Sequence, residues 1–524
     1  MSWTGWLIFF LVLQVIHAFG TWKMYVAAGK KAWEALIPVY NAVVFMKILN
    51  RPWWYVLLLF LPVVNLIMFM VVWVEGLRSF GYNQTKHTVL AILTLGLYLY
   101  FINYTQPLNY KEDRSLKPRT SAGEWTSSIL FAIVAATIVH TYVMQPFIIP
   151  SPSLEKTLLT GDFLFVSKFH YGARIPMTPV ALPMVHDTIP VVHVKSYLDQ
   201  PQIPYTRLPG FTDVKRNDIV VFNWPADTIY GYPSLDGLYH YKPIDKKSNY
   251  VKRCVGVAGD TLSIMDGKVH INGDPLQLPE RAKLQYSYLT QTKGRTIDLK
   301  DLKENYDVTD AVQQGYRKGS DVPAAFFSAA TDAAAAALEN TDNILKMERQ
   351  IDTAGIWRTN IFPYNSKIAN NNDNVKPFLI PAKGMTTPIH YDNIDYFKRI
   401  IEVYEGSEMN LLNTISINGK SVLLNGAPLT SYTFKQNYYW LMGDNRHNSA
   451  DSRSWGFVPE NHVVGKPVFV WMSMDWSGSF PSLRLERMFT TVNGSGQPTS
   501  YLWILIVGII GYIAYKKFSK KKNK

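Results

Sequence analysis

Five long apolar segments without a charged side chain constrain this chain more than any other feature. They occupy residues 3–20, 53–74, 87–104, 125–144 and 499–515. Each has about the length of a helix that crosses the ~30 Å hydrocarbon core of a bilayer. Trp and Tyr stand at many of their ends, as they do at membrane–water interfaces. The sequence therefore predicts a membrane protein with about five transmembrane helices.

Two other interpretations fit apolar segments of this length. Helices of similar composition form the cores of soluble proteins, and the first segment has features of a cleaved signal peptide. Residues 18–20 (Ala-Phe-Gly) have the small-x-small pattern of a cleavage site, although no basic residue precedes the apolar stretch. Both alternatives stay open at this point.

Basic residues are concentrated in some of the connections between these segments. Lys and Arg are frequent in residues 21–52 and 105–124 and after residue 515, but rare in 75–86. Because basic connections stay in the cytoplasm, the N-terminus and residues 145–498 are predicted to lie outside. The formal net charge of +13 then indicates the membrane orientation, because the basic residues lie beside anionic lipid. Nucleic acid is not a predicted partner.

The exported part has the pattern of a mainly β domain. Residues 162–168, 218–222 and 250–257 alternate or run in apolar and β-branched residues between turn signals. Residues 261–276 and 414–429 resemble each other, and each predicts a hairpin. They are either two related hairpins paired in one subdomain or a coincidence between two common hairpin solutions.

The residues between the hairpins predict a separate insertion. Residues 320–347 are rich in Ala and predict a long helix within it. The predicted fold class is a multi-pass membrane protein with a mainly β exported catalytic domain and a partly helical insertion. Its predicted parts are an N-terminal membrane region with three helices (1–124), an anchor helix (125–144), an extracytoplasmic domain (145–498, with the insertion at 279–413) and a C-terminal helix with a Lys-rich cytoplasmic tail (499–524).

A candidate serine nucleophile with two candidate lysine bases follows the fourth apolar segment. Ser153 needs a base because a serine hydroxyl is weakly nucleophilic at its free pKa. Lys156 makes a Ser-x-x-Lys motif with it, but the chain lacks the Ser-Asp-Asn and Lys-Thr-Gly tripeptides that accompany this motif in β-lactamases. Lys252 stands in an apolar strand, where burial would lower its pKa toward neutrality. A solvated surface lysine is the plain alternative.

A third stretch, residues 442–453, is dense in hydrogen-bonding side chains between two apolar strands. Its acids and arginines predict a network that holds a site in place, or else a solvated loop. Cys254, the one cysteine, lies two residues after Lys252 and is either an alternative nucleophile or a small core residue. The histidines show no metal-ligand spacing, so neither a metal nor another cofactor is predicted.

These three stretches, in this order and directly after a membrane helix, resemble those of type I signal peptidases. The resemblance covers residues 147–172, 216–225, 250–263 and 441–467, and Lys252 favours the bacterial Ser-Lys branch over the branch that has His. It implies a multi-pass serine endopeptidase of the bacterial inner membrane, with its catalytic domain on the periplasmic side, that removes signal peptides. Its implied partners are preproteins with signal peptides, membrane lipid and the secretion machinery.

The resemblance also implies a role for each matching residue. Ser153 would be the nucleophile and Lys252 the general base, and the Ser153 amide and the Ser151 side chain would form the oxyanion hole. Ser449 would orient the Lys252 ammonium, while Asp451 and Arg453 would pair and support the loop. Two pockets would accept small substrate residues, and their implied lining is Ile149, Pro150, Leu158, Tyr250 and Val251 for the nearer one and Phe147, Leu164 and Val221 for the farther one.

The chain departs from the family pattern Ser-Gly-Ser-Met-x-Pro-Thr around the nucleophile. Pro152 replaces Gly, Leu154 replaces Met and Lys156 replaces Pro, while His447 stands where Asp is usual. None of these changes removes a proposed catalytic group. The competing hypothesis is a scaffold with the same fold that binds exported proteins or partners and does not cut them.

Overall fold

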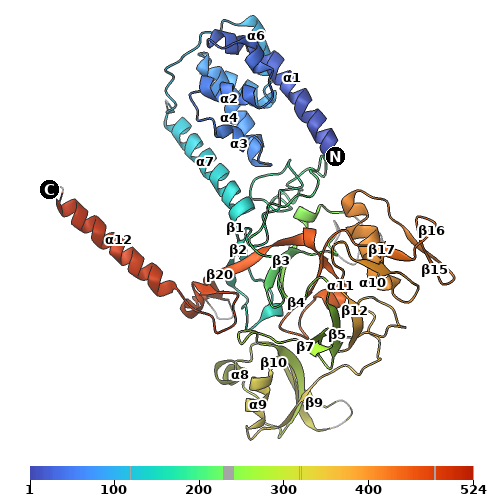
Figure 1. The fold of residues 1–524 in the computed structure, drawn as a ribbon. Coiled ribbons are helices and arrows are strands. Elements are labelled where there is room, and N and C mark those ends of the chain that lie inside the picture. Colours follow the sequence, from blue (N-terminus) through green and yellow to red (C-terminus); the bar gives the residue numbers. More distant parts are fainter. Residues whose placement is uncertain (119, 228–240, 318, 320, 477–479, 523–524) are drawn as a thin grey trace. The chain divides into compact units, whose positions relative to one another are not determined.

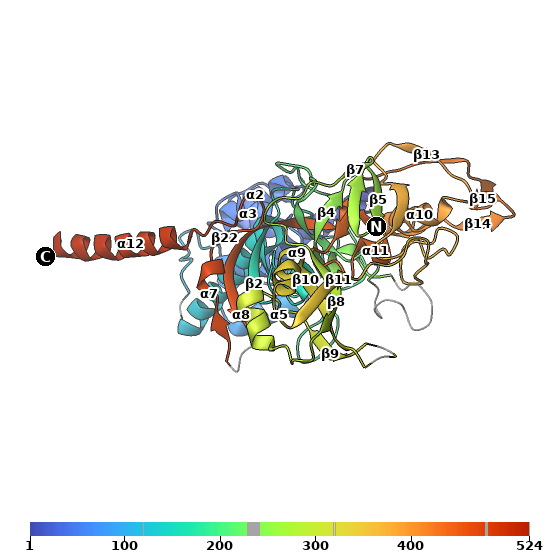
Figure 2. The ribbon, with the colours of Figure 1, turned by 90° about the horizontal axis from the view of Figure 1, so that it is seen from below.

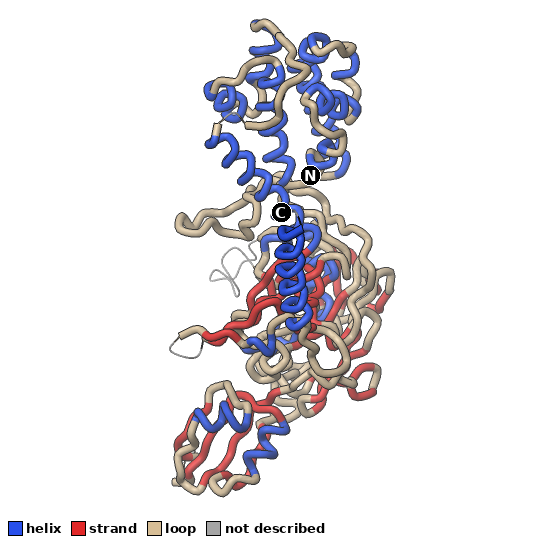
Figure 3. Tube along the Cα trace, turned by 90° about the vertical axis from the view of Figure 1, so that its left-hand side faces the viewer, coloured by secondary structure: helices blue, strands red, loops and turns tan. Residues whose placement is uncertain are grey.

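The computed structural model describes residues 1–118, 120–227, 241–317, 319, 321–476 and 480–522. The chain divides into two compact units, and helices predominate in the first while strands predominate in the second (Figure 3). The first unit comprises Met1–Val143, Ala173–Leu208 and Tyr241–Lys246, and the second comprises Met144–Gly172, Pro209–His240 and Lys247–Lys524. Part of the segment predicted to be exported, residues 173–208, therefore clusters with the N-terminal helices.

The first unit is a helical body (Figure 1). Its helices are α1 (Trp3–Ala27), α2 (Tyr40–Ile48), α3 (Tyr55–Leu58), α4 (Val64–Ser79), α5 (Thr85–Leu93), α6 (Tyr98–Thr105) and α7 (Ser121–Ile138). Within the described part of the chain, two helical stretches are long and apolar enough to cross a membrane, Trp3–Ala27 and Ser121–Val143. They overlap the first and fourth apolar segments, and α12 (Leu502–Lys522) overlaps the fifth.

The expectation of one continuous helix is wrong for the second and third apolar segments. The second is broken between α3 and α4, where Pro62 is followed by Val63 with a φ of 70°. Proline removes a backbone donor and clashes with the preceding helical turn, which favours a break. The third is broken between α5 and α6 at Gly96, whose φ is 85° and whose position against the Trp73 ring leaves no room for a Cβ.

The two ends of the second segment lie close together. Arg51 and Glu75 form an ion pair, and a guanidinium nitrogen of Arg114 lies 3.6 Å from the same carboxylate. At the end of α4, the Ser79 carbonyl accepts a hydrogen bond of 2.8 Å from the Lys111 amide. The second segment therefore doubles back toward the connection that precedes α7.

The second unit is built on a nine-stranded sheet whose pairings are antiparallel, in the order β1-β2-β20-β3-β4-β18-β19, with β21 and β22 paired to β20. The predicted strands at 162–168, 218–222 and 250–257 are confirmed as β2, β3 and β4. The sheet comprises β1 (Met144–Ile148), β2 (Asp162–Ser167), β3 (Ile219–Asn223), β4 (Asn249–Gly256), β18 (Tyr438–Met442), β19 (Val458–Pro459), β20 (Val463–Asp475), β21 (Ser482–Leu483) and β22 (Thr490–Thr491).

Both predicted hairpins form, but they are not paired with each other. They belong to different sheets, because β12 joins the first hairpin and the second stands by itself. The strands are β5 (Thr261–Met265), β6 (Lys268–Ile271) and β7 (Asp274–Pro275) with β12 (Val375–Leu379), and β14 (Ile415–Asn418), β15 (Ser421–Leu424) and β16 (Ala427–Pro428). Beside them lie β13 (Thr386–Pro388), β17 (Ser431–Thr433) and α10 (Ile394–Arg399).

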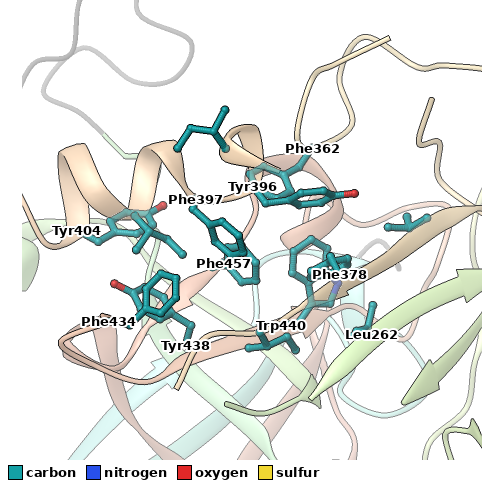
Figure 4. Packing of buried hydrophobic residues seen from close by; sticks show 14 of the residues in the cluster. Leu262, Phe362, Phe378, Tyr396, Phe397, Tyr404, Phe434, Tyr438, Trp440 and Phe457 are labelled. Carbon is teal, nitrogen blue, oxygen red and sulfur yellow. The ribbon is translucent and has the colours of Figure 1, made fainter. Parts of the chain in front are cut away.

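The two hairpins pack around one core instead, and Figure 4 shows the aromatic side chains of this core. Trp440 of β18 is 1% exposed, and its ring lies 4.6 Å from the Phe378 ring of β12. Phe457 and Tyr438 pack in the same cluster. This core fixes the end of β18, from which the polar loop at residues 443–451 emerges.

The insertion contains a sheet of its own, in the order β11-β8-β10-β9, whose core also includes residues of α8 and α9 (Figure 2). Its elements are β8 (Gln285–Thr292), α8 (Leu299–Tyr306), β9 (Val312–Tyr316), β10 (Pro323–Thr331), α9 (Asp332–Glu339) and β11 (Ile344–Arg349). The long Ala-rich helix is wrong, since the helix begins at Asp332 and the preceding Ala-rich residues form the central strand β10. Packing between β8 and β9 overrides the local helix preference of Ala.

Candidate active site

Ser153 lies in a tight turn that follows β1. A short 3-10 turn covers Pro152–Leu154, and proline at its first position suits the fixed φ of that turn. The buried side chains of Leu154 and Leu158 anchor the loop in an apolar cluster. Ser153 itself is 7% exposed, so the turn places its hydroxyl at the edge of the buried interior.

Lys252 meets Ser153 from strand β4 of the same sheet. The pairing of β3 with β4 sets Lys252 opposite Val220, and the lysine is only 3% exposed. Its Nζ lies 2.5 Å from Ser153 Oγ. Burial, which disfavours the charged ammonium, lowers the pKa of Lys252 to about 8, with a smaller opposing effect from Asp451. The structure thus joins a hydroxyl to an amine that is partly neutral near physiological pH.

The two alternative candidates, the Lys156 amine and the Cys254 thiol, have other surroundings. Lys156 points to the insertion, where its Nζ lies 2.8 Å from Asp307 Oδ1. Lys252, and not Lys156, is the lysine that hydrogen-bonds to the Ser153 hydroxyl. Cys254 is fully buried in a cluster with Val220 and Leu441. Burial raises the pKa of its thiol well above the usual value, which keeps it protonated and poorly nucleophilic. Cys254 is therefore a core residue.

Asp451 and Arg453 form a buried ion pair in the loop after β18. Their two contacts measure 2.9 Å (Nε to Oδ1) and 2.8 Å (NH2 to Oδ2), and the side chains are 0% and 3% exposed. Asp451 also accepts a hydrogen bond of 3.1 Å from the Gly443 amide. Burial alone would raise the pKa of Asp451, but Arg453 holds that pKa below its usual value.

Sequence reasoning missed a second buried ion pair beside the site. Arg253 Nε lies 2.8 Å from Asp444 Oδ1 and its NH2 lies 2.6 Å from Oδ2. Thr157 Oγ donates to the same carboxylate at 2.6 Å. The signal was present, because neighbours in a strand point to opposite faces and a buried arginine in an apolar strand requires an acid. Together with Thr157, this pair ties the Lys252 strand to the loop that carries Ser153.

Ser449 lies beside the dyad but makes no hydrogen bond to Lys252, as had been expected. Within the part of the chain that the structure describes, its buried Oγ has no hydrogen-bond partner. The side chain packs against Gly443, where an added Cβ would lie 2.3 Å from Ser449 Oγ and 2.5 Å from the Ser153 carbonyl oxygen. The Lys252 amine is directed to Ser153 instead, so an orienting role for Ser449 stays a prediction.

Most of the residues expected to line the pockets gather in one apolar cluster next to the Ser153 loop. Of the remaining two, Pro150 is exposed, and Tyr250 packs in the adjacent cluster with Trp224 and Trp455. Ser151 is also exposed and precedes the 3-10 turn. The residues in the cluster are Phe147, Ile149, Leu158, Leu164, Val221 and Val251.

A serine hydroxyl held by a buried lysine on a β scaffold defines a class of hydrolases, and comparisons with known proteins agree. Residues 122–334 and 389–472 match the family described as signal peptidase, peptidase S26. Residues 33–113 match a family of unknown function (DUF5684). The chain therefore belongs to the S26 signal peptidase family of serine peptidases.

Individual relatives support the same assignment. The signal peptidase I of Buchnera aphidicola (subsp. Baizongia pistaciae) is 25% identical over 370 residues, which cover 70% of this chain and 82% of that protein. The signal peptidase I of Haemophilus influenzae is 24% identical over 409 residues (74% and 80%). The Helicobacter pylori (strain 26695) protein of the same name is 25% identical over 383 residues (70% and 92%).

Proposed function

We propose that this protein is a membrane-bound serine endopeptidase that removes N-terminal signal peptides from exported preproteins, with Ser153 and Lys252 as its catalytic dyad. The observation that carries the proposal is the 2.5 Å distance between Lys252 Nζ and Ser153 Oγ in a buried setting. Membership of the signal peptidase family supplies the substrate class.

The reaction follows from the state of the lysine. Neutral Lys252 accepts the proton of Ser153 while Oγ attacks the scissile carbonyl carbon, and the amide nitrogen leaves with that proton. The mature protein departs and the signal peptide remains as an ester on Ser153. Lys252 then takes a proton from a water molecule, the hydroxide attacks the ester, and Ser153 is regenerated.

The groups around the dyad have separate roles. The Ser153 amide and the exposed Ser151 hydroxyl donate hydrogen bonds to the carbonyl oxygen as negative charge develops on it. The apolar cluster beside the nucleophile receives the small residues before the cleavage site, and the extended signal peptide adds as a strand beside Pro150 and Tyr250. Asp451 and Arg453 support the loop that faces Lys252. Ser449 in this loop would accept a hydrogen bond from the protonated amine of Lys252.

The membrane topology combines charge and fold. We propose that α1, α7 and α12 cross the inner membrane, while the broken second and third segments enter it and return to the cytoplasmic side. The contacts from Glu75 to Arg51 and Arg114 support this, because residues on opposite faces of a bilayer could not meet. Three crossings keep residues 145–498 on the periplasmic side, as five would, near lipid and the secretion machinery.

Cleavage of a preprotein by purified full-length enzyme in lipid vesicles tests the activity. Ser153→Ala and Lys252→Ala should each abolish cleavage, whereas the exposed neighbours in a distant hairpin, Ser421→Ala and Lys420→Ala, should retain it. Undiminished cleavage by either dyad variant contradicts the mechanism. Binding of the preprotein without cleavage by the wild type would favour the scaffold instead.

Labelling with a membrane-impermeant maleimide tests the topology. Asn83 lies between the second and third segments, so Asn83→Cys should resist labelling from outside if there are three crossings and react if there are five. Asp342→Cys in the insertion is the exposed external control and Lys30→Cys is the internal one, all in a Cys254→Ser background.

A further inference from the structure

The nucleophile loop has an unusual backbone at Lys156. Its φ is 69°, in the left-handed region that residues other than Gly and Asn rarely adopt. The side chain is 4% exposed although it carries a flexible ammonium group. Nζ donates to Asp307 Oδ1 at 2.8 Å and to Thr309 Oγ at 3.0 Å. Both partners lie in the insertion, just after α8, so the insertion holds this strained loop.

The same stretch of the insertion also contacts the loop after β18. Asp310 Oδ2 accepts from Asn445 Nδ2 at 3.2 Å, and its Oδ1 accepts from Asn448 Nδ2 at 3.0 Å. Burial raises the pKa of Asp310, while these amides and Lys156 act in the opposite direction. Residues 307–310, which we name the clasp, therefore bind both loops of the active site at once.

Asn445 connects the clasp to the peptide groups around the nucleophile. Its backbone amide donates to the Ser153 carbonyl at 3.1 Å, and its side-chain amide donates to the Pro152 carbonyl at 3.2 Å. The Pro152 carbonyl belongs to the same peptide plane as the Ser153 N–H, because a peptide unit is planar. Fixing this carbonyl therefore fixes the direction in which the Ser153 N–H points.

We propose that the clasp is a positioning element for catalysis, and that Asp310 and Lys156 are positioning residues that act through Asn445 and the loop backbone. An oxyanion donor works only when it is aimed at the developing charge, and displacements of about 1 Å cost large factors in rate. The insertion thus orients the nucleophile and its amide. This inference rests on the proposed function, because positioning has a meaning only for an enzyme.

The test measures kcat and KM for preprotein cleavage by the full-length enzyme in vesicles. Asp310→Ala and Lys156→Met should each lower kcat about tenfold with KM within about twofold, since the substrate pockets are untouched. Lys156→Arg, which keeps the ion pair, should recover most of the rate. Asp342→Ala and Lys300→Met change exposed residues of the same insertion and serve as matched controls.

A double variant tests the proposed contact directly. Because Asp307 is the charged partner of Lys156, Lys156→Met combined with Asp307→Asn should be no slower than Lys156→Met alone. Asn is used because Asp307 also has a left-handed backbone, with a φ of 54°.

Three results would overturn the positioning role. They are a kcat within twofold of the wild type for both single variants, additive losses in the double variant, and a kcat loss that disappears when the rate is divided by the folded fraction. These outcomes leave the proposed function intact as long as the wild type cleaves and Ser153→Ala does not.

Discussion

The proposed role of Lys252 as the base, with its depressed pKa, predicts a definite dependence of the cleavage rate on pH. Only the neutral amine can accept the Ser153 proton, and burial lowers its pKa from 10.5 to about 8. The reactive fraction is then about one half at pH 8, about a tenth at pH 7 and about a hundredth at pH 6, since each unit is a factor of ten. An unperturbed lysine would leave only about a thousandth reactive near pH 7.5.

The pH dependence of kcat/KM reports this group in the free enzyme. We expect a plateau above pH 9 and an acid limb of unit slope that bends near pH 8, measured with a preprotein substrate in vesicles at constant ionic strength. Circular dichroism at each pH separates loss of rate from loss of fold. A profile that stays flat from pH 9 to pH 6, or bends near pH 10.5, would refute the assignment of Lys252 as a buried base.

Two further predictions concern stability, measured as thermal unfolding in detergent. Lys252→Met should stabilise the protein by about 2 kcal/mol at pH 7, because it removes a charge penalty of about 3 kcal/mol and a hydrogen bond of about 1 kcal/mol. The gain should shrink as the pH rises from 8 to 10.5, where the folded wild type loses its proton before the unfolded chain does. Asp451→Ala should destabilise by about 3–5 kcal/mol, because it leaves Arg453 buried without a counter-ion.

Each of these has an outcome that contradicts it. A Lys252→Met variant that is less stable than the wild type at pH 7 would mean that the ammonium is well solvated or paired. An Asp451→Ala variant with unchanged stability would mean that Arg453 is compensated by its other contacts, the Arg446 and Asn372 carbonyls.

Local patterns were enough to predict the strands that form the site. Strands β2, β3 and β4 alternate or run in apolar residues, and the turn signals between them are short-range. The Ala-rich residues 323–331 failed because their preference for a helix is overridden by pairing on both sides with β8 and β9. The prediction of one continuous helix failed for the second and third apolar segments, because an apolar composition indicates burial and does not show whether a helix is continuous. Pro62 and Gly96 mark the two breaks.

For the candidate site, too, the sequence predicts some contacts and not others. Ser153 and Lys252 are 99 residues apart, and their meeting follows from the resemblance to a family and not from local sequence. The pair of Arg253 with Asp444 and the clasp depend on how distant loops pack. A buried arginine in the apolar strand β4 indicates that an acid must pair with it, but no periodicity in the loops shows which acid, or that the clasp forms.

Two of the departures from the family pattern, Lys156 and His447, both contact the insertion. Proline, the usual residue at position 156, has a φ near −65° and is incompatible with the φ of 69° found here, and it has no amine for Asp307. His447 accepts a hydrogen bond of 3.0 Å from the Ser287 amide of β8 in the same insertion. Lys156→Gly, which tolerates this φ, should therefore keep the fold and lower kcat about tenfold, as is expected for Lys156→Met. Lys156→Pro should disrupt the loop itself. Equal thermal stability of these two variants would show that the loop does not need its left-handed backbone.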